Sequence, residues 1–159
     1  MKIGFYAGSF DPFTNGHLEV VKKASLLFDK LVIGIGLNPD KKRRFDDNQM
    51  KLAIEKVLKK ENVFGAKVVI YKGLTVDAAK EYKTAFLVRG IRNGMDYDYE
   101  ENLANINEEV SGVDTIFVRA GKLGFVSSSM VCEFFKNGKD ISKYVPNEIL
   151  EIMQNNGKI

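Results

Sequence analysis

The chain has 159 residues, of which 45% are hydrophobic and 28% charged, a balance typical of globular proteins rather than disordered ones. Lys and Arg number 24 against 21 Asp and Glu, and the net charge of +3 is too small by itself to indicate a nucleic-acid-binding protein. One cysteine excludes an internal disulfide framework, and no apolar run approaches the ~20 residues that span a bilayer, so we expect a cytoplasmic protein that binds neither nucleic acid nor membrane.

Apolar runs typical of buried strands alternate along the chain with stretches in which apolar residues recur at helical spacing. The first element is a predicted strand at residues 3–7, and the last is a helix at 147–153 that Pro146 introduces. Between them the pattern predicts, in order, a helix at 16–28, a strand at 31–37, a helix at 48–59, a strand at 67–71, a helix at 75–82, a strand at 85–88, a helix at 97–110, a strand at 115–118 and a helix at 128–135.

This alternation predicts an α/β fold: a single Rossmann-like, doubly wound domain over residues 1–159, with a five-stranded parallel sheet and helices on both faces. In an open parallel sheet, ligands bind beyond the carboxyl ends of the strands, at the point where the strand order reverses. With the order 3-2-1-4-5, that point lies between the first and fourth strands. The segments that follow these two strands are therefore expected to lie side by side.

The segment after the first strand reads Gly-Ser-Phe-Asp-Pro-Phe-Thr-Asn-Gly-His, from Gly8 to His17. Gly8 permits the backbone to approach a ligand closely, and Ser9 offers a hydroxyl and an amide. A helix then begins at Gly16, and the unpaired N–H groups of a helix start suit phosphate. His17 is the only histidine. The alternative is a histidine that merely packs against the turn, but its neighbours favour a nucleotide phosphate site.

Two arginines follow the predicted fourth strand, in the sequence Arg-Gly-Ile-Arg at residues 89–92. Guanidinium groups bind phosphate oxygens directionally, and the glycine between the arginines again permits close backbone approach. The alternative is ion pairing with nearby carboxylates. We expect such pairing less at Arg89, which directly follows a buried strand, than at Arg92. The candidate carboxylates are Asp96, Asp98 and Glu100.

Two further segments are predicted at the same edge of the sheet. The run Lys-Lys-Arg-Arg at residues 41–44 follows the second strand, and one member is expected to reach a phosphate, although sequence chemistry alone does not say which. Phe-Val-Ser-Ser-Ser at residues 125–129 follows the fifth strand and enters a helix, where hydroxyls and free amides form an anion site. The alternatives are a solvated basic loop and an ordinary helix cap.

Taken together, these motifs resemble bacterial phosphopantetheine adenylyltransferases, a family of the nucleotidyltransferase superfamily, over essentially the whole chain. Thr14 and Asn15 are typical of this family, whereas the wider superfamily has His-x-Gly-His at this place. The resemblance implies transfer of an adenylyl group from ATP to 4′-phosphopantetheine, giving dephospho-coenzyme A and pyrophosphate, the penultimate step of coenzyme A synthesis. It also implies Mg²⁺ as cofactor, a homohexamer and inhibition by coenzyme A.

The resemblance implies roles for individual residues. His17 and Lys41 would be catalytic, with His17 stabilising the transition state. The implied substrate contacts are Ser9, Lys41, Thr75 and Arg89. The implied ATP contacts are Ser9, Phe10, His17, Gly90, Ile91, Arg92, Glu100, Leu123, Gly124, Phe125, Val126, Ser127, Ser128 and Ser129. Cys132 departs from the family, because a basic residue commonly stands there, and this leaves open which group contacts ATP at that place.

The acceptor phosphate is already a nucleophile, so we expect direct in-line attack on the α-phosphorus of ATP without a covalent enzyme intermediate. The sequence shows no carboxylate cage, so we expect Mg²⁺ to arrive with the ATP phosphates and water rather than at a metal site of the protein.

Other functions stay open at this point. A nicotinate mononucleotide adenylyltransferase is disfavoured by Thr14, and a cytidylyltransferase fits the arginine and serine segments less well. A non-catalytic nucleotide-binding regulator would have no need of His17. A dehydrogenase would show Gly-x-Gly-x-x-Gly after the first strand, and this chain does not.

Overall fold

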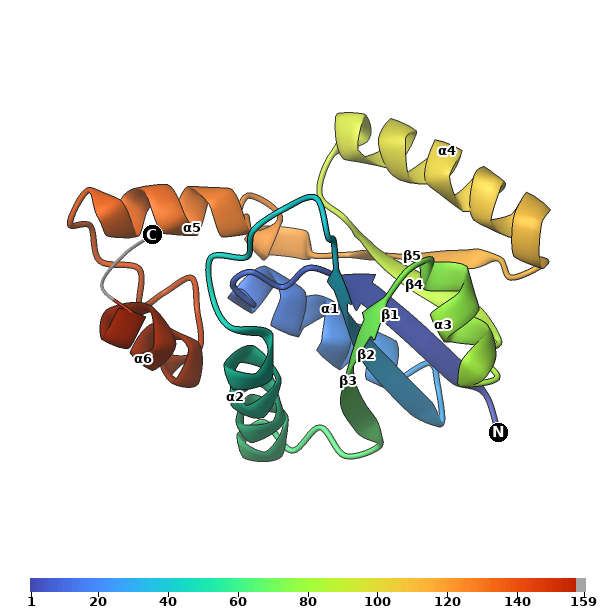
Figure 1. Ribbon diagram of the computed structural model, residues 1–159, viewed down its shortest axis with the longest axis horizontal. Coiled ribbons are helices and arrows are strands. Elements are labelled where there is room, and N and C mark those ends of the chain that lie inside the picture. Colours follow the sequence, from blue (N-terminus) through green and yellow to red (C-terminus); the bar gives the residue numbers. More distant parts are fainter. Residues whose placement is uncertain (157–159) are drawn as a thin grey trace.

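The computed structural model describes residues 1–156, so the last three residues of the predicted domain lie outside the described residues. A five-stranded parallel sheet runs in the order β3-β2-β1-β4-β5, which confirms the predicted fold and strand order (Figure 1). The strands are β1 (Ile3–Gly8), β2 (Lys30–Leu37), β3 (Ala66–Lys72), β4 (Phe86–Ile91) and β5 (Thr115–Arg119).

Helices cover both faces of the sheet, as predicted. The helices are α1 (Asn15–Ser25), α2 (Asp47–Lys60), α3 (Thr75–Glu81), α4 (Gly94–Ser111), the short η1 (Gly121–Leu123), α5 (Ser128–Lys136) and α6 (Asn147–Asn156). Figure 1 shows α3 and α4 on one side of the sheet, with α1, α2 and α6 on the other. Within residues 1–156, none of the helices has the length and apolar character needed to cross a membrane.

Alternation along β1 divides the apolar interior into two cores. The Tyr6 side chain packs into the larger core with α1, α2, α5 and α6, whereas Phe5 and Ala7 point to the smaller core under α3. This is the two-residue period of a strand whose faces are both covered. The central strand is therefore fixed from both sides, and its carboxyl end is a rigid base for the loop that follows.

Two of the boundaries that differ from the predictions affect the candidate site. Residues 89–91 were expected to follow the fourth strand, but they belong to it, because β4 pairs with β5 through Arg89, Gly90 and Ile91. The helix expected from residue 97 begins at Gly94, because the Asn93 side chain accepts a hydrogen bond from the Asp96 amide and caps it.

The carboxyl ends of the strands gather the predicted segments. β1 lies between β2 and β4, so the loops after these three strands adjoin at one edge of the sheet. η1 and the start of α5 follow β5 at the same edge, and η1 contacts α1. The reversal of strand order thus falls where the sequence places it, between β1 and β4.

Candidate active site

His17 and Thr14 cap the start of α1 reciprocally. The Thr14 side chain accepts a hydrogen bond from the His17 amide across 3.3 Å, and the Thr14 amide donates to His17 Nδ1 across 2.9 Å. This is a capping box in which an imidazole takes the place of the usual glutamate. Because Nδ1 accepts a hydrogen bond, the neutral ring carries its proton on Nε2.

The His17 ring is held among aromatic side chains. Its centroid lies 5.0 Å from that of Phe10 and 5.6 Å from that of Phe13. Burial, together with the positive charges of Arg92 and Arg89, lowers the pKa of His17 to about 3. The ring is therefore neutral near pH 7 and offers a neutral Nε2–H donor to the cavity that it lines.

The glycines of the two motifs leave space that the protein itself fills. Phe10 has a φ of 46°, and its ring folds back so that a Cβ on Gly8 would stand 2.9 Å from it. A Cβ on Gly90 would stand 3.1 Å from Val20 of α1. Both glycines line a cavity, but their lack of a side chain also makes room for the Phe10 ring and for the close packing of α1 on β4, which the sequence did not predict.

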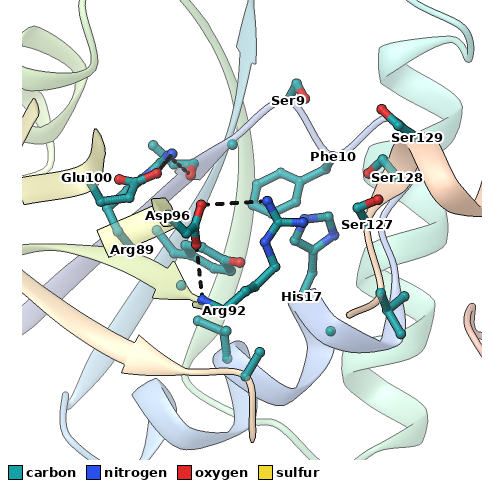
Figure 2. A pocket seen from close by; sticks show the side chains of 18 residues that line it. Ser9, Phe10, His17, Arg89, Arg92, Asp96, Glu100, Ser127, Ser128 and Ser129 are labelled. Atoms are coloured by element: carbon teal, nitrogen blue, oxygen red, sulfur yellow. Dashed lines mark hydrogen bonds and ion pairs between the residues drawn. The ribbon is translucent and has the colours of Figure 1, made fainter. Parts of the chain in front are cut away.

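Two cavities adjoin at this edge of the sheet. The histidine cavity, of about 270 Å³, is lined by His17 and by residues of β1, β4 and the start of α5 (Figure 2). The lysine cavity, of about 910 Å³, is lined by Lys41 and Thr75 among others. Both are lined by four residues, which form a shared wall between them: Ala7, Gly8, Ser9 and Arg89.

The predicted contacts separate between the two cavities. All the residues predicted to contact substrate, namely Ser9, Lys41, Thr75 and Arg89, line the lysine cavity. Most predicted ATP contacts line the histidine cavity, and these are Ser9, Phe10, His17, Gly90, Arg92, Glu100, Val126, Ser127, Ser128 and Ser129. The structure does not bring the remaining four, Ile91, Leu123, Gly124 and Phe125, to either lining.

Arg89 is locked in the shared wall by a bidentate ion pair. Its Nε and Nη2 donate to the two carboxylate oxygens of Glu100, each across 2.8 Å, and its Nη1 donates to the Ala7 carbonyl across 2.7 Å. Arg92 pairs with a carboxylate as expected, but the expectation that Arg89 is less prone to such pairing was wrong, because Arg89 forms the closer pair. β4 extends through Arg89 and α4 begins early, so Glu100 lies buried over the strand end.

Arg92 forms the weaker pair. Its Nη2 lies 3.5 Å from an Asp96 carboxylate oxygen, and 40% of its side chain is exposed, against 29% for Arg89. The Asp96 carboxylate also accepts the Arg92 amide across 3.0 Å. Figure 2 draws this pair among the residues that line the histidine cavity. Arg92 therefore keeps most of its donors free for a ligand.

The basic run is fastened to the loop after β1. Arg43 donates to the carbonyls of Ser9 and Phe10, across 2.6 Å and 3.3 Å. The Asp11 carboxylate accepts the amides of Arg44 and Phe45, across 2.8 Å and 3.0 Å. No local pattern in the sequence indicates these contacts of Asp11, because its partners lie more than thirty positions away.

The members of the run divide by position. Lys41, Arg43 and Arg44 line the lysine cavity, whereas Lys42 lines neither cavity. The run is therefore not simply a solvated loop, and Lys41 is the lysine that the fold brings to the site.

The serines at the start of α5 cap the helix and also line the histidine cavity. Ser127 caps the helix by accepting the Met130 amide, and the Ser128 hydroxyl donates to the Pro12 carbonyl across 2.7 Å. Both also line the histidine cavity, together with Ser129. Cap and cavity are compatible, because a capping hydroxyl leaves other helix-start amides open.

The histidine cavity is also lined by Tyr6, which the sequence did not predict. Tyr6 is buried and lines the cavity, and burial raises the pKa of its hydroxyl above the usual range. Its position inside an apolar strand gave no signal in the sequence.

Within residues 1–156, no three His, Cys, Asp or Glu side chains lie close enough together to hold a metal ion.

Comparison with known proteins places this geometry in a family. The model of the cytidylyltransferase-like family matches residues 5–134. A phosphopantetheine adenylyltransferase from Porphyromonas gingivalis is 40% identical over 91% of this chain and 94% of its own. Relatives of the same name from Lachnoclostridium phytofermentans and Streptococcus pneumoniae are 41% and 43% identical, each over 99% of this chain and 98% of its own. The chain belongs to the phosphopantetheine adenylyltransferase family.

Membership in the phosphopantetheine adenylyltransferase family makes the chain a nucleotidyltransferase and confirms the resemblance inferred from its motifs. A solved protein from Vibrio parahaemolyticus, a candidate nicotinate-nucleotide adenylyltransferase, superposes with a TM-score of 0.72 over 99% of this chain and 94% of its own. At 19% identity, this likeness concerns the fold alone.

Proposed function

We propose that the chain transfers the adenylyl group of ATP to 4′-phosphopantetheine, releasing pyrophosphate and forming dephospho-coenzyme A in the penultimate step of coenzyme A biosynthesis. Family membership supports this, and one structural observation carries it: the two cavities meet at the shared wall. ATP in the histidine cavity and the acceptor in the lysine cavity bring their phosphates together beside Ser9 and Arg89.

In the proposed step, an oxygen of the acceptor phosphate attacks the α-phosphorus of ATP in line, and the bond from that phosphorus to the β-phosphate oxygen breaks. Pyrophosphate leaves with the electron pair, so no covalent enzyme intermediate is needed. Nε2–H of His17 donates to an α-phosphate oxygen that gains charge in the transition state. The ring needs only to donate a hydrogen bond, which suits a group that is neutral near pH 7.

Lys41, Thr75 and Arg89 are the proposed holders of the acceptor phosphate. Glu100 fixes the direction of the Arg89 guanidinium, so part of the ordering cost is met before the substrate binds. Lys41 is a mobile cation by comparison, since its ammonium rotates on a flexible stem. This division gives one fixed contact and one adaptable contact to the attacking phosphate.

The remaining phosphates of ATP are proposed to lie at the start of α5, where Ser127, Ser128 and Ser129 line the histidine cavity. The two carboxylates that line the histidine cavity, Asp96 and Glu100, are each paired with an arginine. This arrangement fits an Mg²⁺ ion that is held by phosphate oxygens and water rather than by the protein. When bound, Mg²⁺ neutralises part of the triphosphate charge.

The family resemblance also supports a cytoplasmic homohexamer that coenzyme A inhibits. Coenzyme A contains the whole of dephospho-coenzyme A. If the product dephospho-coenzyme A occupies both cavities, coenzyme A can occupy the same two cavities as an inhibitor. Light scattering of the purified chain tests the assembly, and inhibition kinetics against 4′-phosphopantetheine test the ligand.

The deciding experiment compares acceptors. The protein is incubated with ATP and Mg²⁺ and either 4′-phosphopantetheine or nicotinate mononucleotide, and with CTP and a polyol phosphate, while pyrophosphate release is measured. Release is expected with 4′-phosphopantetheine alone. Faster pyrophosphate release with another acceptor would identify that acceptor as the substrate in place of 4′-phosphopantetheine. ATP binding without pyrophosphate release for any acceptor would point to a regulator.

A further inference from the structure

Arg44 lies where three elements of the site meet. Its amide donates to the Asp11 carboxylate across 2.8 Å, and its Nη1 donates to the Asp11 carbonyl across 2.9 Å. Its Nη2 donates to the Ser129 hydroxyl across 3.5 Å. The residue therefore bridges the loop after β1, the loop after β2 and the start of α5.

This bridge also joins the rims of the two cavities. Arg44 lines the lysine cavity, and its partner Ser129 lines the histidine cavity. A guanidinium has five N–H donors, and the contacts to Asp11 and Ser129 take one from each of two nitrogens. Donors remain for an anionic ligand, on a side chain whose position the protein already holds.

The start of α5 carries no cation of its own. None of the residues from 127 to 132 is charged, and burial raises the pKa of the Cys132 thiol, so it stays neutral near pH 7. Of the charged groups that act on this thiol, Arg44 acts most strongly. The positive charge at the serine end of the site thus comes from a different loop.

We propose that Arg44 binds the β- and γ-phosphates of ATP, the part of the nucleotide that leaves as pyrophosphate. This assignment rests on the proposed function. With the α-phosphorus beside His17, the outer phosphates extend toward Ser127 and Ser129, and the Arg44 guanidinium meets them from the other side. Charge builds on the pyrophosphate as the bond to the α-phosphorus breaks, and a guanidinium held in place stabilises that charge.

Nucleotide binding to Arg44→Gln tests the assignment by calorimetry with ATP and with AMP. ATP is expected to bind about tenfold more weakly, the effect of losing one charged hydrogen bond, whereas AMP, which lacks the outer phosphates, binds as in the wild type. Lys42→Gln is the matched control. Lys42 lies two positions from Arg44 and lines neither cavity, so removing its positive charge is expected to leave ATP binding unchanged. Arg44→Lys keeps the charge and restores part of the affinity.

Three results would overturn the assignment. Unchanged ATP binding means that Arg44 makes no contact. Equal weakening of ATP and AMP means that it only holds the loop. A raised KM for 4′-phosphopantetheine with normal ATP binding places it at the acceptor. If Arg44→Gln does not fold, Arg44→Lys carries the same comparison of ATP with AMP. Failure of the wild type to release pyrophosphate would count instead against the proposed function, since the nucleotide-binding comparison does not depend on an acceptor.

Discussion

The backbone amide of Thr14 determines which nitrogen of His17 can donate a hydrogen bond. Its N–H occupies Nδ1 across 2.9 Å, so only Nε2 can carry the donor proton of the neutral ring. The hydrogen bond between Thr14 and His17 thus both caps α1 and orients the proposed catalytic donor. A change at Thr14 would disturb both.

Loss of the His17 donor is expected to affect rate rather than ATP binding. For His17→Ala we expect kcat to fall about 10²–10³-fold, the usual cost of removing one transition-state donor, with the Kd of ATP little changed. Steady-state kinetics and calorimetry measure the two quantities. His17→Gln, which keeps an N–H donor, is the control and is expected to retain more activity. Near-normal turnover of His17→Ala would contradict the assigned role.

The lowered pKa of His17 predicts how stability depends on pH. The folded state keeps the ring neutral down to a pKa of about 3, whereas the unfolded chain takes up the proton below 6.5. Stability from this group is therefore present above pH 6.5 and is lost as the pH falls toward 3. Between pH 7 and pH 5, the wild type should lose about 2 kcal/mol more unfolding free energy than His17→Ala does. Urea unfolding at both pH values checks this, and equal losses would mean that the ring is not held neutral.

The two arginine pairs predict unequal costs. Glu100→Gln leaves the mostly buried Arg89 without its counter-charge, and we expect the free energy of unfolding to fall by about 2–3 kcal/mol, with a raised KM for 4′-phosphopantetheine. Asp96→Asn at the more exposed Arg92 is the matched change, expected to cost less than about 1 kcal/mol. Similar losses in the two variants would show that burial does not separate the pairs.

Lys41 and Lys42 provide a contrast within one run. Lys41→Ala is expected to raise the KM for 4′-phosphopantetheine and to lower kcat, each about tenfold or more, because a charged contact to the attacking phosphate is lost. Lys42→Ala removes the same charge from a residue that lines neither cavity, and its kinetics are expected to match the wild type. A larger effect from Lys42 would reverse the choice between them.

The sheet could be predicted from sequence because its signal is local: apolar runs mark the strands, and the turn chemistry after β1 marks the switch point. The Arg89–Glu100 pair could not, because it depends on where α4 begins, and Asn93 sets that boundary with one side-chain contact. The Asp11–Arg44 contact is even harder to predict from sequence, since it joins two loops that only the packed sheet brings together. That the chain is a single domain stays a prediction, as do the roles of the site residues.

Because of the shared wall, the two cavities can act as one continuous binding site for a longer ligand. Because Ser9 and Arg89 belong to both linings, a molecule that tethers an adenylate to a pantetheine phosphate would fill both at once. Tethering turns the second binding event into an intramolecular one, so such a bisubstrate compound gains affinity without any new contact. Since such a compound could not share the site with either substrate, its inhibition is expected to be competitive against both ATP and 4′-phosphopantetheine.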